Sequence, residues 1–398
     1  MTDWFNTTIG EQVRLQRGFD ITRAEQREGP IPVISSGGVS SYHDRAMVRG
    51  PGVILGRKRV VGSVFYVSED YWPHDTTLWV RNFCGNNPRF VYYFFVSIRA
   101  KLESLDVGSA NPTLNRNHLH PQPTYWPTRS DQDAIAYLLG ALDDKIELNR
   151  RMAETLEAMA RALFRSWFVD FDPVSAKAEG RPTGLSDDLA VLFPNRFGED
   201  GLPFGWATRN LVDDFRVVMG QSPPGSTYNE DGKGVPFYQG RTDFGFRFPT
   251  RRVFCTAPAR IARPGDTLLS VRAPVGDINM ADEECCLGRG VAALRHNSGS
   301  SSFTYYAVQV LQPTISSFND DGTVFGAINR QQLEKVSSIN PGSTIIKAFH
   351  NSVEPLDERI ALDLQQVSAL ATLRDTLLPK LISGELRIAD AEKRISAA

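Results

Sequence analysis

Two stretches of the chain place apolar residues at alternating intervals of four and three, the spacing of one face of a coiled-coil helix. The first stretch covers residues 130–168, and the second repeats it 214 residues later. The inward positions are Ile135, Leu139, Leu142, Ile146, Asn149, Ala153, Leu156, Ala160, Leu163 and Trp167 in the first, and Phe349, Val353, Leu356, Ile360, Asp363, Val367, Leu370, Arg374, Leu377 and Leu381 in the second. Each stretch predicts a helix of roughly 38 residues, about 57 Å long at 1.5 Å per residue.

The ends and the middle of these predicted helices carry polar signals. Ser130 followed by Asp133 is typical of a helix N-terminus, and Pro173 ends the first helix because proline cannot continue one. A stripe this long would stay exposed on an isolated helix, so we expect the two helices to pack on each other, antiparallel because the chain returns. Asn149 and Asp363 stand at matched midpoints, where a polar pair would fix the register. The alternative, that both face solvent at a local defect, is equally compatible with the sequence.

The same offset relates segments outside the two stripes. Residues 115–119 match residues 329–333, and residues 142–146 match residues 356–360, in both cases 214 positions apart. The offset slips slightly in the earlier part of each half, which indicates loops of different length. We therefore interpret the chain as an internal repeat with a constant frame and two variable lobes.

Short segments bounded by Gly and Pro precede each long helix and indicate mixed lobes. Strands are expected at residues 52–55, 62–67, 76–80 and 266–271, and helices at residues 88–103 and 302–311. The predicted fold is α+β, with two globular domains joined by two long antiparallel coiled-coil helices in a pseudo-two-fold internal repeat. The expected boundaries are 1–127 for the first domain, 128–172 for the first helix, 173–204 for a linker, 205–348 for the second domain and 349–398 for the second helix and tail.

Composition adds limits on location and partners. The formal net charge is −2, but residues 1–127 carry +3 and residues 205–348 carry +2, while the remaining stretches are acidic. Slightly basic lobes favour anion binding only weakly, because an ordinary solvated surface would look similar. No apolar run is long enough to span a membrane, and no secretory signal is visible. The four cysteines include the vicinal pair Cys285 and Cys286 and lack a Cys-x-x-Cys spacing, which favours a cytoplasmic protein.

Most catalytic signatures are missing from the sequence. It has no phosphate-binding loop of the Gly-x-x-x-x-Gly-Lys-Ser/Thr type and no Gly-x-Gly-x-x-Gly opening a helix. Residues 111–114 begin like an aminomethyltransferase motif but lack the aromatic ring that would stack on a flipped base. His118 and His120 have no further ligand at metal-binding spacing. We expect no catalytic residue and no metal site in this chain, which favours binding over catalysis.

Polar loop residues remain, of the types that reach base edges and phosphates in DNA. The candidates in the first lobe are Ser35, Ser36, Tyr42, His43, Arg57, Lys58, Arg59, Asn111 and Thr113, and those in the second are Tyr238, Gln239, Arg241, Arg272, Asn319 and Thr323. Taken one at a time, each is more often a plain surface residue. Arginine outnumbers lysine 35 to 9, which suits planar bidentate contacts but also follows from a GC-rich genome.

These residues resemble the specificity subunit of type I restriction–modification enzymes over almost the whole chain. The segments that carry the resemblance are 53–62 with Trp72 and Asp75-Thr76, then 108–115, 142–149, 167–171, 268–277 and the closing residues 377–386. One departure is Arg59-Val60-Val61, where the family often has a glycine-containing turn.

The resemblance implies different roles for the lobes and the helices. Each lobe would be a target recognition domain that reads one half of an asymmetric, bipartite site in double-stranded DNA. The helices would set the unread gap and dock two methyltransferase subunits, and two restriction–translocase subunits could join. S-adenosylmethionine would bind in the methyltransferase partners, so this chain would hold no cofactor.

Two other functions are compatible with the same pattern. A coiled-coil scaffold whose lobes bind proteins or glycans would show no salt-dependent affinity for DNA. An enzyme with a site between the lobes would show strongly perturbed carboxylates in a cleft.

Overall fold

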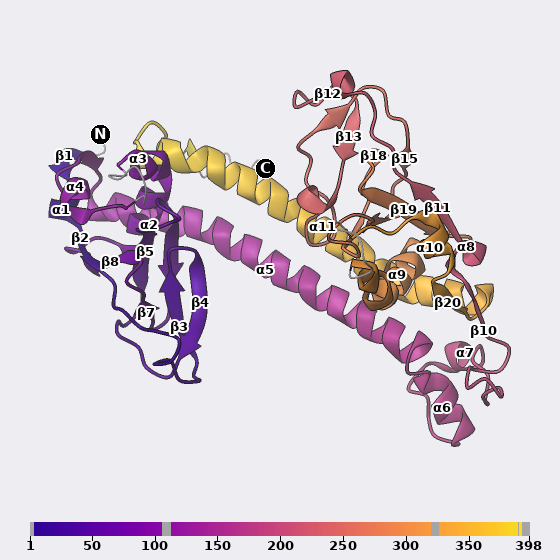
Figure 1. Ribbon diagram of the computed structural model, residues 1–398. Helices are drawn as coiled ribbons and strands as arrows, with labels where there is room; N and C mark the ends of the chain where they lie inside the picture. Colours follow the sequence, from indigo (N-terminus) through magenta and orange to yellow (C-terminus); the bar gives the residue numbers. More distant parts are fainter. Residues whose placement is uncertain (1–3, 106–112, 320–325, 389, 392–398) are drawn as a thin grey trace. The chain divides into compact units, whose positions relative to one another are not determined.

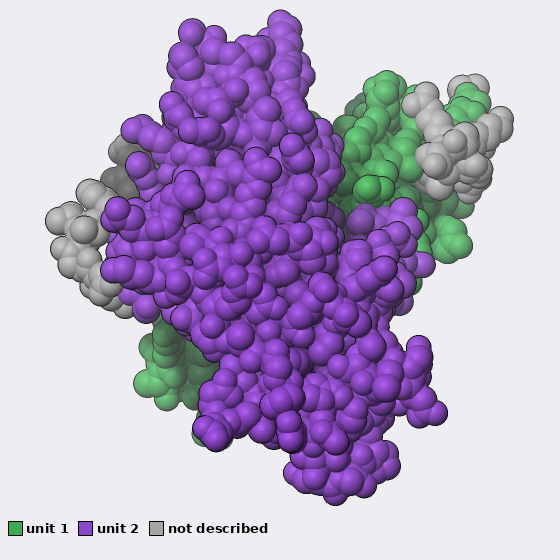
Figure 2. All heavy atoms as spheres, turned by 90° about the vertical axis from the view of Figure 1, so that its right-hand side faces the viewer, with its two compact units in different colours: residues 1–151, 363–398 green, residues 152–362 purple. Residues whose placement is uncertain are grey.

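The computed structural model describes residues 4–105, 113–319, 326–388 and 390–391 (Figure 1). The chain forms two compact units, residues 1–151 with 363–398 and residues 152–362 (Figure 2). We call them unit 1 and unit 2. Both mix helices and sheets, as the predicted α+β class requires. None of the helices in the described ranges is long and apolar enough to cross a membrane.

Unit 1 contains three small sheets and a helical layer. Its strands and short helices are β1 (Phe5–Thr8), α1 (Ile9–Gln12), β2 (Arg14–Arg17), β3 (Ile31–Ser35), β4 (Gly38–His43), β5 (Gly52–Gly56), β6 (Val64–Val67), β7 (Trp72–Pro73), β8 (Thr77–Asn82), α2 (Pro88–Ser97), α3 (Arg99–Ser104), α4 (Arg116–Leu119) and β9 (Pro123–Trp126). The sheets have the strand orders β2-β8-β5-β6, β4-β3-β7 and β1-β9. All pairings are antiparallel except β3 with β7.

Unit 2 contains the corresponding elements and a larger second sheet. Its elements are α6 (Asp172–Ala178), α7 (Asp187–Ala190), β10 (Ala207–Asn210), α8 (Leu211–Asp214), β11 (Phe215–Met219), η1 (Gly225–Thr227), β12 (Tyr228–Asn229), β13 (Val235–Tyr238), η2 (Arg241–Asp243), β14 (Phe254–Cys255), β15 (Ile261–Ala262), β16 (Thr267–Ser270), β17 (Ile278–Met280), β18 (Cys285–Leu287), β19 (Val291–His296), α9 (Ser301–Ser316), η3 (Ser317–Asn319), α10 (Arg330–Glu334) and β20 (Ser337–Asn340). The sheets have the orders β11-β19-β16-β17, β12-β14-β13-β18-β15 and β10-β20.

Two 40-residue helices, α5 (Arg129–Phe168) and α11 (Ser343–Ile382), contribute to both units, and their first and last residues lie 214 positions apart. All the inward positions predicted from the sequence are buried or half-buried. In unit 1 the two segments run antiparallel, because Asn149 Nδ2 donates to Gln366 Oε1 at 2.9 Å and Arg374 donates to Asp143 at 2.7 Å.

Polar residues at the helix midpoints are buried rather than solvated. Asn149 is 2% exposed and Asp363 is not exposed at all, so the solvent-facing alternative is wrong. The partner of Asn149 is Gln366, one turn beyond Asp363. A direct pairing of Asn149 with Asp363 stays a prediction.

Several element boundaries differ from the sequence predictions. Residues 88–103 were expected as one helix, but α2 and α3 are separate because Ile98 leaves the helical conformation. The second long helix was expected from residue 349 and begins at Ser343, where Ile345 and Ile346 add buried apolar residues. Pro173, expected as the stop of the first helix, lies in the first turn of α6, where proline is tolerated.

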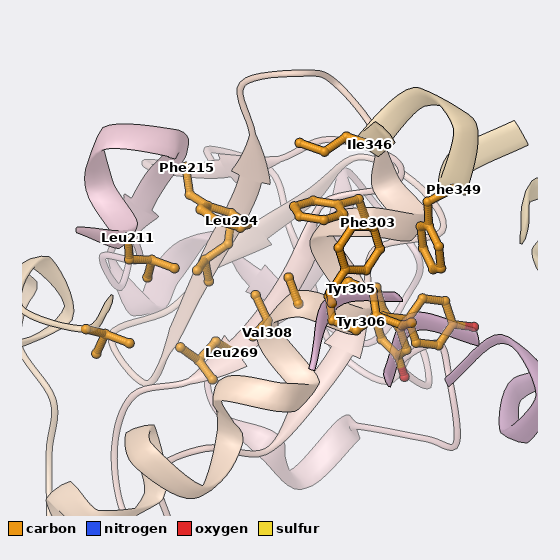
Figure 3. Packing of buried hydrophobic residues seen from close by; sticks show 14 of the residues in the cluster. Leu211, Phe215, Leu269, Leu294, Phe303, Tyr305, Tyr306, Val308, Ile346 and Phe349 are labelled. Carbon is orange, nitrogen blue, oxygen red and sulfur yellow. The ribbon is translucent and has the colours of Figure 1, made fainter. Parts of the chain in front are cut away.

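Each unit has its own apolar core between sheet and helices. In unit 1, Asn87 caps α2 by accepting from the amides of Arg89 and Phe90, and α2 then packs Phe90 and Phe94 against Trp126. Gly140 lets the Arg89 guanidinium lie against α5, since a Cβ there would come within 2.8 Å of it. In unit 2, the rings of Phe303, Tyr306 and Phe349 gather beside Leu294 and Val308 (Figure 3).

Candidate nucleic-acid interface

A set of loops at one end of the strands of the β2-β8-β5-β6 sheet, which we call the loop frame, positions Arg57 and Lys58 in unit 1. The chain leaves β5 at Gly56, and the Arg57 amide donates to the Thr76 carbonyl at 2.9 Å. The Leu114 amide donates to the Arg57 carbonyl at 2.9 Å, and Lys58 forms an isolated bridge with Thr113. Three separate segments therefore converge just before β8 begins.

Unit 2 has an equivalent arrangement of backbone hydrogen bonds. The Val271 amide donates to the Gly290 carbonyl at 2.9 Å, and the Ile328 amide donates to the Val271 carbonyl at 3.0 Å. Arg272 forms an isolated bridge with Ala327. Each of these residues lies 214 positions after its counterpart in unit 1, so the sequence offset corresponds to equivalent places in the two folds.

In unit 1 the frame gathers cations around one carboxylate. Asp75 accepts from Arg17 Nη2 at 2.7 Å and from Lys58 Nζ at 3.4 Å. Burial opposes ionisation of Asp75, but the hydrogen bond from Arg17 and the charge of Lys58 outweigh it and hold its pKa below the usual value. Arg57 lies beside them with its Nη1 buried and without a hydrogen-bond partner. Burial and the charge of Arg17 lower the pKa of Arg57.

In unit 2 the equivalent place is a hollow of about 730 Å³ lined by three arginines, Arg260, Arg272 and Arg289. Gln221 and Asn329 also line it, and its described lining contains no Asp or Glu. All three arginines are exposed, and within the described ranges none of their guanidinium groups forms an ion pair. The hollow is therefore positively charged and offers amide groups beside the arginines.

Other candidates of the first lobe fall into two groups. Tyr42 is 57% exposed on β4, and Arg59 is exposed beside Lys58. Ser36 and His43 are buried at 5% and 6%, and Ser35 Oγ donates to the Gly38 carbonyl within its own turn.

His43 has a structural role that accounts for its burial. Its Nδ1 accepts from the Arg27 amide at 3.0 Å, and its ring packs edge-on against Trp72. The structure thus corrects the expectation that the side chains of Ser36 and His43 face DNA.

Candidates in the second lobe divide in the same way. Gln239 and Arg241 are exposed, and Arg241 is paired with Asp277 at 2.5 Å. Tyr238 is 1% exposed, and burial raises the pKa of its phenol, so this side chain belongs to the core rather than to a DNA surface. Asn319 closes η3, and Asn111 and Thr323 lie outside the described residues.

Six residues of these frames were absent from the predicted set: Arg17, Asp75, Gln221, Arg260, Arg289 and Asn329. A usable signal existed for Arg289, because it stands 214 positions after Asp75 in the internal repeat. Arg17 and Arg260 lie far from the frame in sequence, so only the fold brings them to it.

Asp20, His74 and Asp75 lie close enough together to hold a metal ion. Asp75 already pairs with Arg17 and Lys58, and His74 Nδ1 lies 3.1 Å from Thr76 Oγ1. These cations compete with a metal for the Asp75 carboxylate, so we assign no metal to the group.

The fold and the loop frames define an α+β protein with two equivalent polar loop clusters and paired long helices. Residues 1–158 match the family model of the type I restriction modification DNA specificity domain. The putative type I restriction enzyme MjaX specificity subunit of Methanocaldococcus jannaschii is 28% identical over 282 residues, which cover 69% of this chain and 62% of that protein. The type I restriction enzyme HindI specificity subunit of Haemophilus influenzae is 27% identical over 314 residues, 65% of this chain and 68% of that protein.

A solved structure shares the fold. The crystal structure of the type I restriction–modification S subunit from M. genitalium aligns with a TM-score of 0.65 at 18% identity, covering 96% of each chain. The family model and these relatives confirm the resemblance predicted from the sequence: the chain is similar to type I restriction enzyme specificity subunits. The match to the first of these relatives spans 62% of that protein's length.

Proposed function

We propose that this chain is the non-catalytic specificity subunit of a type I restriction–modification enzyme and reads an asymmetric, bipartite DNA site. The observation that carries the proposal is the pair of equivalent loop frames, one in each unit, that present different cationic side chains at the same backbone positions. Equivalent frames suit one task performed twice, and different side chains suit two different half-sites.

The finer architecture belongs to the same proposal. Residues 1–127 and 205–348 act as two target recognition domains, residues 128–172 and 349–398 supply antiparallel coiled-coil spacers, and residues 173–204 form a linker. The shared strand order of β2-β8-β5-β6 and β11-β19-β16-β17 supports a pseudo-two-fold repeat. Tyr93 donates to Asp143 in unit 1 as Tyr306 donates to Asp357 in unit 2, which supports it further.

The partners follow from the apolar residues that the long helices leave uncovered. In unit 1, Tyr137 and Leu148 are 80% and 54% exposed and lie eleven residues apart, or three turns, on one face of α5. In unit 2, Met152 and Met159 are 41% and 54% exposed and lie two turns apart. Exposed apolar side chains on a helix suit a protein partner. One methyltransferase subunit would dock on each unit, with S-adenosylmethionine bound in that partner, and two restriction subunits would join in the cytoplasm.

Methylome sequencing of a host that expresses this chain with its methyltransferase partner tests the proposal. The expected result is one methylated motif with two different halves and an unmethylated gap of fixed length. Replacing residues 1–127 by the matching segment of another specificity subunit should change only one half of the motif. Absence of any methylated motif, or a change in both halves, would contradict the proposal. A scaffold for proteins or glycans would leave the methylome empty.

A further inference from the structure

The two equivalent loop frames carry side chains of opposite charge at one position. Asp75 in unit 1 and Arg289 in unit 2 both stand two residues before the strand that crosses the sheet, β8 at Thr77 and β19 at Val291. Their neighbours differ too, because Lys58 corresponds to Arg272 and Arg57 to the buried Val271. One backbone frame therefore carries a carboxylate among cations in unit 1 and cations alone in unit 2.

The first strands of the two sheets extend this equivalence. The Gly18 amide donates to the Thr77 carbonyl at 3.1 Å, and the Gly220 amide donates to the Val291 carbonyl at 3.0 Å. Arg17 thus corresponds to Met219, so unit 2 lacks the cation that pairs most closely with Asp75 in unit 1. Unit 2 therefore lacks both the carboxylate that corresponds to Asp75 and the cation that corresponds to Arg17.

The three arginines of unit 2 stand out against their neighbours. Arg241, Arg251, Arg252 and Arg295 each pair with a carboxylate at 2.8 Å or less. Arg260, Arg272 and Arg289 form no ion pair among the described residues, as is also true of Arg216 and Arg263, but these three line one hollow that contains no described carboxylate. Three like charges that share a hollow repel each other, so an anion bound there would be stabilised by all of them.

On the basis of the proposed function, we infer that the Arg260–Arg272–Arg289 hollow of unit 2 binds backbone phosphates of DNA, whereas unit 1 neutralises the cations of its own frame, Arg17 and Lys58, with Asp75. Unit 2 then contributes more of the salt-dependent affinity. Unit 1 holds Arg17 and Lys58 in fixed directions through Asp75, and this favours directional contacts over charge attraction.

Salt titrations of the full chain with a random-sequence 30-bp duplex test the inference, because phosphate contacts do not depend on sequence. Each of Arg260→Ala, Arg272→Ala and Arg289→Ala should reduce the slope of log K against log salt by about 0.9. A slope that is smaller by about 0.9 corresponds to binding that is roughly eightfold weaker at 0.1 M salt. Arg251→Ala and Arg252→Ala are matched controls, because these exposed arginines of the same unit already pair with carboxylates. Their slopes should equal that of the unaltered chain.

Asp75→Asn tests the other half of the inference. Releasing Arg17 and Lys58 should increase the salt slope by about 1, since at least one more cation becomes available to a phosphate. An unchanged slope in the three alanine variants, with salt-dependent binding by the unaltered chain, would overturn the phosphate site and leave the proposed function intact. An unchanged slope in Asp75→Asn would overturn the role of Asp75. Failure of the unaltered chain to bind any duplex in a salt-dependent way would overturn the proposed function as well.

Discussion

Arg59 has a backbone conformation that favours glycine. Its φ is +67°, in the left-handed region. A side chain in this conformation costs about 1 kcal/mol, so Arg59→Gly should raise the free energy of unfolding by up to about 1 kcal/mol. Urea denaturation of the full chain measures the change.

A DNA titration of the same variant separates strain from function. If Arg59 contacts a phosphate, Arg59→Gly will bind DNA more weakly although it is more stable. Arg59→Lys keeps both charge and strain and serves as the matched control. A loss of stability in Arg59→Gly would contradict the strain argument.

A buried histidine, His296, and a half-buried one, His120, predict a dependence of stability on pH. His296 lies between Phe215 and Phe303, and burial lowers its pKa despite the opposing charge of Asp214. Burial and nearby arginines also lower the pKa of His120, whose Nε2 accepts from the Leu15 amide. Because the unfolded chain then binds protons more readily than the folded one, stability should fall as pH drops below about 6.5.

Thermal melts between pH 7.5 and 5.5 measure this dependence. His120→Gln and His296→Asn keep a hydrogen-bond acceptor near the original nitrogen and remove the titration, so each should flatten the curve. Curves as steep as that of the unaltered chain would contradict the assignment.

For single residues, the sequence predicted which side chains have the polar groups to contact DNA, but not which of them are buried. Arg57, Lys58 and Arg272 stand on the frames because a strand ends beside them, which the pattern of Gly and apolar residues indicates. His43 and Tyr238 also carry polar atoms that could reach DNA, yet His43 packs against Trp72 and Tyr238 lies in the core of unit 2. Only long-range packing separates the two groups.

At the scale of elements, the long helices were predicted well because a seven-residue repeat depends on local spacing alone. Strands β5, β6, β8 and β16 were also found near the predicted residues. The β3-β4 hairpin and the five-stranded sheet of unit 2 were missed, since their strands are short and pair with segments far apart in sequence.

The buried Arg247 connects the second lobe to both long helices within unit 2 through two ion pairs. Arg247 is 1% exposed and pairs with Glu157 of α5 at 3.4 Å and with Asp357 of α11 at 2.7 Å. Its guanidinium also lies 3.7 Å from the centre of the Tyr305 ring. Arg247→Met would remove the buried cation from two carboxylates, although Glu157 keeps its ion pair with Arg161 and Asp357 keeps the hydrogen bond from Tyr306. Removing one partner of a buried ion pair typically costs about 3–5 kcal/mol of the free energy of unfolding, and the remaining partners place the expected cost at the lower end of this range.

Chemical denaturation of the full chain checks this value. Arg330→Met is the matched control, because the Arg330–Glu334 pair is exposed and contributes at most about 0.5 kcal/mol. Arg247→Met combined with Glu157→Gln should recover part of the loss, since one of the two carboxylate charges that Arg247 balances is then removed. Equal effects of Arg247→Met and Arg330→Met would refute the role of Arg247.

For the whole molecule, the constant offset of 214 in the helices predicts that their length sets the number of base pairs between the two proposed half-sites. Removing residues 147–153 and 361–367 deletes one heptad from each helix at matched positions and keeps the apolar stripes in phase. Seven helical residues span about 10.5 Å, which corresponds to roughly three base pairs at 3.4 Å each. If the helices set the distance between the half-sites, the methylated motif should keep both halves and lose about three base pairs from its gap. Duplicating the same two heptads should lengthen the gap by the same amount. An unchanged gap in both variants would show that the length of the helices does not set the distance between the half-sites.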